Sequence, residues 1–187
     1  MGGGYVGRVV VRLLREFGAR VVLVDLTMIS SGAAGLGVEL MPLADMLTTS
    51  DIVTLHGPLV PETNGMNGGS KLALLKDGAL FVNMGRGQLV DEAALLAELK
   101  SGRIEAVLDV YHTEPLPADS RFKALPNARL SSHAAGRTED SHYRRGRALS
   151  GQWNSQARNN EDSSAHRGVK PFRNQPVDEI ARSSLIH

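Results

Sequence analysis

The chain has 187 residues, of which 42% are hydrophobic and 22% charged, as expected for a soluble globular protein with one ordinary domain and a short addition. It has no cysteine and its six histidines lack metal-ligand spacing, which excludes disulfides and thiolate catalysis and predicts no metal site. The net charge is +1, no apolar run approaches the ~20 residues of a membrane span, and basic residues do not cluster densely, so we expect a cytoplasmic protein without a membrane or nucleic-acid partner.

The chain opens on a glycine-rich stretch, "MGGGYVGRVV", in which Gly2, Gly4 and Gly7 form the pattern G-x-G-x-x-G. A helix is predicted to follow directly, over residues 6–18, because apolar residues recur at helical spacing. The apolar face predicted for this helix consists of Val9, Val10, Leu13, Leu14 and Phe17.

Beyond this helix, short apolar runs alternate with helical segments. The runs have the composition of strands buried on both faces, and they cover residues 19–25, 50–56, 78–84, 104–111 and, more weakly, 128–133. Helices are predicted between them over residues 42–50, 68–77 and 91–102. The alternation predicts an α/β fold, a Rossmann-type doubly wound parallel sheet, over residues 1–146. Residues 147–187 are polar and lack a sustained period, which predicts an irregular and flexible C-terminal tail.

The opening glycines have two interpretations, a phosphate-binding loop or a merely flexible start. A loop is favoured because the glycines open a helix whose free N–H groups and dipole suit a pyrophosphate. The next predicted strand ends in Asp25, about 20 residues on, where an acid accepts hydrogen bonds from an adenosine ribose. An acid there would repel a 2′-phosphate, so the pattern favours NAD over NADP. The alternative makes Asp25 a solvated turn residue.

Four longer stretches occur in a fixed order: "SDIVTLHGPLVPETNGM", "VNMGRGQLVDEAAL", "LDVYHTEPLP" and "LPNARLSSHAAGRTED". Together with the glycine loop they strongly resemble the NAD-binding domain of the D-isomer-specific 2-hydroxyacid dehydrogenases, from Gly2 to about Leu149. The resemblance implies an NAD-dependent oxidoreductase that acts on the CH–OH group of a D-2-hydroxy acid and reversibly reduces a small 2-keto acid. It also implies a homodimer formed through this domain.

The resemblance implies a catalytic trio, each member at a predicted strand end. Arg86 would hold the carboxylate and carbonyl oxygen of the substrate, a task for which a planar guanidinium is suited. His133 would exchange a proton with the carbonyl oxygen, and Glu114 would fix the tautomer of that imidazole. Taken singly, each has a plainer interpretation, as a loop cation, a strand-end histidine and a turn acid.

The same resemblance implies a set of contacts to NAD. The glycines and the two residues inside the loop would lie at the pyrophosphate, and Asp25 at the ribose. Further residues would line the adenine side and the nicotinamide side. The complete set is Gly2, Gly4, Tyr5, Val6, Gly7, Asp25, Pro58, Thr63, Met84, Gly85, Arg86, Asp109, His133 and Gly136.

Relative to the family pattern, the first strand of the sheet is expected to be missing, because only Met1 precedes the glycine loop. That strand normally lies centrally in the sheet, so its loss predicts marginal stability. The family's substrate domain is also expected to be missing, which predicts a truncated chain. Three interpretations stay open: the cofactor domain of a dehydrogenase, a non-catalytic NAD-binding or dimerisation module, and a decayed gene fragment.

Overall fold

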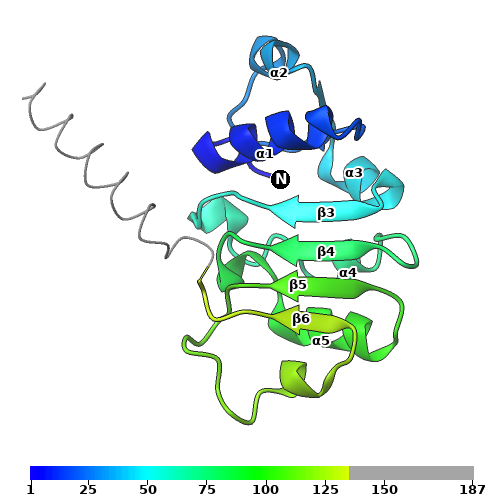
Figure 1. Cartoon of the computed structure of the whole chain (residues 1–187), viewed down its shortest axis with the longest axis vertical. Coiled ribbons are helices and arrows are strands. Elements are labelled where there is room, and N and C mark those ends of the chain that lie inside the picture. Colours follow the sequence, from blue (N-terminus) through cyan, green and yellow to red (C-terminus); the bar gives the residue numbers. More distant parts are fainter. Residues whose placement is uncertain (135–187) are drawn as a thin grey trace, which may run out of the picture. The chain divides into compact units, whose positions relative to one another are not determined.

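The structure of the protein, a computed structural model, describes residues 1–134, in which helices and short strands alternate (Figure 1). The predicted domain boundary at residue 146 and the tail over residues 147–187 lie outside the described residues. The described helices are α1 (Tyr5–Glu16), α2 (Ser30–Leu36), α3 (Leu43–Thr49), α4 (Gly69–Leu72) and α5 (Glu92–Lys100). The strands are β1 (Val22–Leu23), β2 (Glu39–Leu40), β3 (Ile52–Leu55), β4 (Leu80–Asn83), β5 (Glu105–Leu108) and β6 (Ala128–Leu130).

Four of the strands form one parallel sheet in the order β3-β4-β5-β6, and β1 and β2 form a separate parallel pair. The arrows of β3 to β6 point the same way in Figure 1, so their carboxyl ends meet at one edge. This parallel arrangement confirms the predicted Rossmann-type α/β fold. It also means that loops distant in sequence are gathered at that edge, where ligands bind in such sheets.

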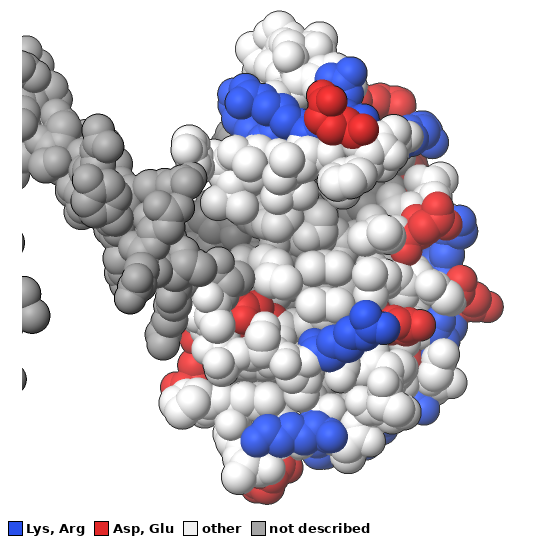
Figure 2. Space-filling view, viewed as in Figure 1, with Lys and Arg blue, Asp and Glu red and all other residues white. Residues whose placement is uncertain are grey.

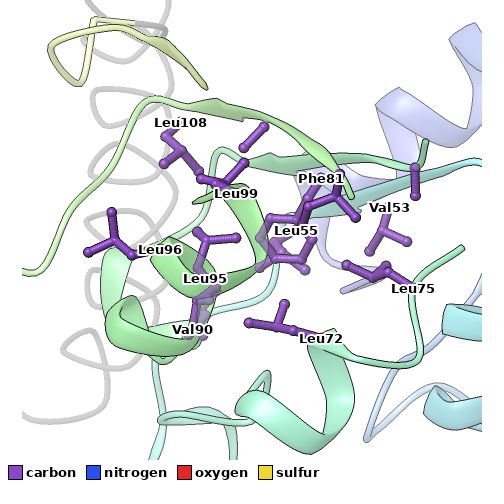
Figure 3. Packing of buried hydrophobic residues seen from close by; sticks show 14 of the residues in the cluster. Val53, Leu55, Leu72, Leu75, Phe81, Val90, Leu95, Leu96, Leu99 and Leu108 are labelled. Atoms are coloured by element: carbon purple, nitrogen blue, oxygen red, sulfur yellow. The ribbon is translucent and has the colours of Figure 1, made fainter. Parts of the chain in front are cut away.

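The main hydrophobic core lies between the sheet and helices α4 and α5 (Figure 3). Strands β3, β4 and β5 bury alternate residues, as the two-residue repeat of a strand requires: Val53 and Leu55 in β3, Phe81 in β4, and Leu108 in β5. The labelled side chains that meet in this core are Val53, Leu55, Leu72, Leu75, Phe81, Val90, Leu95, Leu96, Leu99 and Leu108. The core therefore fixes the sheet whose edge carries the candidate site.

The limits of α5 follow the sequence signals. The Asp91 carboxylate accepts a hydrogen bond from the backbone N–H of Ala94 at 3.0 Å and so caps the N-terminus of the helix, as aspartate commonly does. Just beyond the helix, Gly102 adopts a left-handed φ of 75°, a conformation that glycine tolerates and that stops the helix.

Met1 and Gly2 lie between β1 and β3 and connect the two sheets. The N-terminal ammonium donates to Thr54 O at 2.6 Å, and the N–H of His56 donates back to Met1 O at 2.8 Å. On the other side, the N–H of Gly2 donates to Val24 O at 2.9 Å. These bonds have the pattern of a parallel sheet and extend it by one step. Met1 and Gly2 therefore occupy the position between β1 and β3 at which the last residues of a central strand would form hydrogen bonds.

Behind Met1, the space between β1 and β3 is an open groove of about 280 Å³. Among residues 1–134 no strand fills this groove. Ile52 at the start of β3 stays 60% exposed in consequence. The view in Figure 2 shows this face, with an uncharged area between α1 and β3. The groove is lined largely by Leu14, Val22, Met46, Ile52 and Val53.

Two expectations about the N-terminal part are wrong. Helix α1 buries Gly7 and Val11, whereas Leu13 and Phe17 of the predicted apolar face are 57% and 88% exposed. The reason is that Val11 packs against the narrow β1–β2 pair and α2 and Gly7 lies against Gly2 and His56, so these contacts cover a single stripe of the helix. The strand predicted over residues 19–25 is reduced to Val22–Leu23, and both α2 and β2 were not predicted.

Candidate active site

The glycine loop lies at the start of α1 and is shaped by two of its three glycines. Gly2 has a left-handed φ of 87°, and a Cβ placed there would lie 2.5 Å from Gly57 N. A Cβ on Gly7 would overlap the carbonyl oxygen of Gly2. Gly4 differs, because a Cβ there meets nothing within 4 Å. The fold itself therefore requires Gly2 and Gly7, and the open side of Gly4 is the place where a phosphate group can approach the backbone.

Alanine substitutions should separate the structural glycine from the ligand-facing one. We expect Gly7→Ala to lower the free energy of unfolding by about 1–3 kcal/mol, because the new methyl group overlaps backbone. Gly4→Ala should leave the free energy of unfolding within about 0.5 kcal/mol and still weaken NAD binding. Urea unfolding and calorimetric titration measure the two quantities. Equal stability of both variants would contradict the packing argument.

Tyr5 and Val6, the other predicted pyrophosphate contacts, lie in the first turn of α1 and are exposed, Tyr5 at 88%. Their backbone N–H groups are among those that a helix start leaves without intrahelical partners. The structure therefore places this pair beside Gly4 at the helix terminus.

Asp25 follows β1 and binds the glycine loop directly. Its Oδ2 accepts a hydrogen bond from Gly3 N at 2.6 Å, and its Oδ1 accepts bonds from Thr27 N, Thr27 Oγ1 and Met28 N at 2.8–2.9 Å. Burial alone would raise the pKa of this carboxyl, but these donors outweigh it and the pKa falls below its ordinary value. Asp25 is thus a fixed carboxylate whose Oδ2 accepts one hydrogen bond from residues 1–134.

A cavity of about 180 Å³ opens beside Asp25 and joins residues that are far apart in sequence. Gly2, Asp25, Pro58 and Thr63, all predicted cofactor contacts, contribute to its wall. The Thr63 hydroxyl lies 2.8 Å from Pro58 O and accepts a bond from Val60 N at 2.9 Å, so it also fixes the loop that forms the wall.

Asn67 also lines this cavity, and the sequence analysis missed it. Its side chain is fully buried, its Nδ2 donates to Leu89 O at 3.1 Å, and its Oδ1 has no hydrogen-bond partner within the described part of the chain. Burying an acceptor without a donor costs free energy of folding. This atom is therefore suited to accept a hydrogen bond from a ligand bound in the cavity. Its place in the glycine-rich turn "NGMNGG" gave no signal of burial.

The predicted trio lies at the carboxyl ends of β4, β5 and β6. Nδ1 of His133 lies 2.6 Å from Glu114 Oε2, and the Tyr111 backbone N–H donates to Glu114 Oε1 at 3.1 Å. The bond with His133 is the main reason that the pKa of Glu114 falls below its ordinary value, and the positive charge of Arg86 contributes. Arg86 is exposed, and its positive charge acts on Glu114.

The loop that carries Arg86 is held by Asn83, a buried residue that the sequence analysis did not select. Asn83 Oδ1 accepts from Gly85 N at 3.1 Å, and its Nδ2 donates to Arg86 O at 2.9 Å. Arg86 Nη1 donates to Gly85 O at 2.7 Å. Met84 and Gly85, the predicted nicotinamide-side contacts, lie in this same loop.

Asp109 lies at the end of β5, and its Oδ1 accepts bonds from Ser131 Oγ at 2.5 Å and from Ala134 N at 3.0 Å. Its predicted contact to the NAD carboxamide stays a prediction. Gly136, the last predicted contact, lies outside the described residues. Within residues 1–134 no three side chains are grouped to hold a metal ion, and none of the helices there combines the length and apolar character that a bilayer crossing requires.

The site residues thus fall into two neighbourhoods. Gly2, Asp25, Pro58 and Thr63 share the cavity, whereas the trio and Asp109 gather at the ends of β4 to β6. Both lie at the carboxyl side of parallel strands, the side on which such sheets bind nucleotides.

Comparison with known proteins agrees with this geometry. Glyoxylate reductase of Korarchaeum cryptofilum is 39% identical over 145 residues, which cover 77% of this chain and 44% of the relative. D-3-phosphoglycerate dehydrogenase of Mycobacterium leprae is 37% identical over 147 residues, 78% of this chain and 28% of the relative. The chain therefore spans less than half the length of these relatives.

Among solved structures, a D-isomer specific 2-hydroxyacid dehydrogenase from Xanthobacter autotrophicus Py2 matches with a TM-score of 0.65 and 39% identity, over 71% of this chain and 44% of that one. D-lactate dehydrogenase with NAD⁺ from Lactobacillus jensenii matches with a TM-score of 0.67 and 29% identity, over 75% of this chain and 46% of that one. The sequence profile described as "D-isomer specific 2-hydroxyacid dehydrogenase, NAD binding domain" matches residues 1–135. The chain therefore belongs to the D-isomer specific 2-hydroxyacid dehydrogenase family, through its NAD-binding domain.

Proposed function

We propose that this chain is the cofactor-binding part of an NAD-dependent oxidoreductase that interconverts a D-2-hydroxy acid and a 2-keto acid. The observation that carries the proposal is the His133–Glu114 pair, whose Nδ1 and Oε2 lie 2.6 Å apart, with the charge of Arg86 acting on Glu114. An imidazole oriented by a carboxylate is suited to move a proton, and a guanidinium is suited to hold a carboxylate.

Three observations on the chain's own residues fit NAD as the cofactor. The open side of Gly4 leaves room for a phosphate at the start of α1. The Asp25 carboxylate stands in the cavity wall, with Oδ2 receiving one donor from the protein. The buried Asn67 Oδ1 lacks a donor. When bound, NAD would supply the hydride acceptor for oxidation, or in reduced form the hydride donor.

The protein's part in the reaction is orientation and proton transfer. Because Nδ1 of His133 faces Glu114, Nε2 is the nitrogen left to give a proton to a carbonyl oxygen or to take one back from a hydroxyl. Glu114 fixes that tautomer through its bond with Nδ1. Arg86 would hold the substrate carboxylate through paired N–H groups, which sets the α-carbon in place.

Two measurements test the proposal in sequence. Calorimetric titration of the purified chain with NAD should show saturable binding that Asp25→Ala weakens, and oxidation of NADH with glyoxylate or hydroxypyruvate should show turnover. Absence of both binding and turnover would contradict the proposal and leave the interpretation of a decayed fragment. NAD binding without turnover would replace it by a non-catalytic NAD-binding module.

A homodimer and a cytoplasmic location stay predictions. The apolar side chains that α1 leaves exposed, Val6 at 56% and Leu13 at 57%, support association of two copies through this helix. Sedimentation equilibrium at micromolar concentration measures the mass, and a monomer throughout that range would contradict the dimer.

A further inference from the structure

The backbone of His133 adopts an uncommon conformation. Its φ is 55°, in the left-handed region that side chains with a Cβ disfavour, and it is the one non-glycine residue with positive φ among residues 1–134. Such a conformation persists only where neighbouring contacts hold it. The question is which contacts fix this residue against Glu114.

One set of contacts brackets His133 in sequence. Oδ1 of the buried Asp109 accepts hydrogen bonds from Ser131 Oγ, two residues before His133, and from Ala134 N, one residue after it. The N–H of Ser131 also donates to Leu108 O at 2.9 Å, which continues the β5–β6 ladder. The two ends of the left-handed turn are therefore tied to the same carboxylate oxygen.

A second contact comes from Tyr111, which is buried in the loop after β5. Its hydroxyl lies 2.7 Å from Ser131 O and 2.9 Å from Leu108 O, and its single proton is donated to one of these oxygens at a time. Burial raises the pKa of Tyr111, so the hydroxyl stays protonated and able to donate. The backbone N–H of the same residue holds Glu114 Oε1. Tyr111 thus touches both the segment of His133 and the carboxylate that faces it.

We propose that the hydroxyls of Ser131 and Tyr111 are positioning groups, which hold His133 in its left-handed turn so that Nδ1 meets Glu114. Neither hydroxyl touches the reacting atoms, and both act through His133. This inference rests on the proposed proton-transfer role of His133 for its functional meaning, but its geometry is testable without turnover.

The test is the titration of the Glu114 carboxyl, followed by carbon-13 NMR in the full chain. Because the bond with His133 is the main cause of the lowered pKa of Glu114, loosening the turn should raise that pKa toward its ordinary value. We expect this upward shift in Ser131→Ala and in Tyr111→Phe, and no shift in Ser131→Thr, which keeps a hydroxyl. Exchange of the Ala134 amide proton should become about five- to tenfold faster in Ser131→Ala, as expected for one lost hydrogen bond.

Ser101→Ala is the matched control, since the Ser101 hydroxyl also donates a hydrogen bond, to Glu98 O at 2.7 Å, but lies on α5 away from the site. Ser101→Ala should change neither the pKa of Glu114 nor the exchange rate of the Ala134 amide proton. An unchanged pKa of Glu114 in Ser131→Ala would overturn the proposal, as would a shift of equal size in Ser131→Thr. If Tyr111→Phe fails to fold, the comparison of Ser131→Ala with Ser131→Thr still tests the proposal.

NAD titration of the unmodified chain keeps the two proposals apart. A chain that fails to bind NAD but shows the Glu114 shifts loses the proposed function and keeps the positioning role. A chain that binds NAD but shows no shift in the variants keeps the proposed function and loses the positioning role.

Discussion

Replacing His133 by alanine is expected to slow the reduction of a 2-keto acid by about 10²–10⁴-fold, the usual contribution of a positioned acid–base group. The loss follows from removing the imidazole that faces Glu114 at the ends of the parallel strands. NAD affinity should fall far less than the rate does, because His133 does not line the cavity beside Asp25. Steady-state oxidation of NADH with glyoxylate or hydroxypyruvate measures the rate, and calorimetry measures the affinity.

His112→Ala is the matched control for this substitution. The His112 ring lies in the loop of Glu114, but its Nε2 lies 2.8 Å from Val90 O, so we assign it to packing. The reduction rate of His112→Ala should stay within about threefold of the rate of the unmodified chain. Glu114→Gln keeps the shape of the side chain and loses its charge, and its reduction rate should fall well below that of the unmodified chain. A His133→Ala rate equal to that of the unmodified chain would remove this imidazole from the mechanism.

The sequence was most informative about the ends of the parallel strands. Arg86, Glu114 and His133 lie in separate stretches, yet parallel strands bring their carboxyl ends to one edge, so strand order alone predicts proximity. The close contact between Glu114 and His133 agrees with the role that the family resemblance implied. The N-cap of α5 was equally predictable, because it depends on a single local signal, Asp91.

The sequence was least informative where long-range contacts decide the outcome. Periodicity predicted a broad apolar face on α1, but burial depends on what lies opposite. Val11 packs against the β1–β2 pair and α2, and Gly7 lies against Gly2 and His56, so only this stripe is buried. The roles of Ser131 and Asn67 depend on partners more than 20 residues away along the chain, which no local pattern encodes.

The free energy of unfolding is expected to rise as the pH increases from 6 to 8, because of the buried N-terminal ammonium. Burial between β1 and β3 lowers the pKa of the Met1 amine from its ordinary 8.0 to about 6, although the charge of Asp25 opposes this. The unfolded chain therefore binds more protons than the folded chain between these values, and stability increases with pH. A difference of two units corresponds to at most about 3 kcal/mol. Urea unfolding followed by circular dichroism at pH 6, 7 and 8 measures it.

Acetylation of the N-terminus tests the cause, because it removes the charge and keeps an N–H that can donate to Thr54 O. The acetyl group would extend into the open groove behind Met1, which has room for it. The acetylated chain should therefore be the more stable one at pH 6 and should lose most of the rise between pH 6 and 8. His56 adds a smaller effect of the same sign below about pH 6.5, since burial and the nearby ammonium lower its pKa, so His56→Gln should keep the main rise. Parallel pH profiles for the free and acetylated chains, each confirmed by mass to retain Met1, would show that the ammonium is not buried in the folded chain.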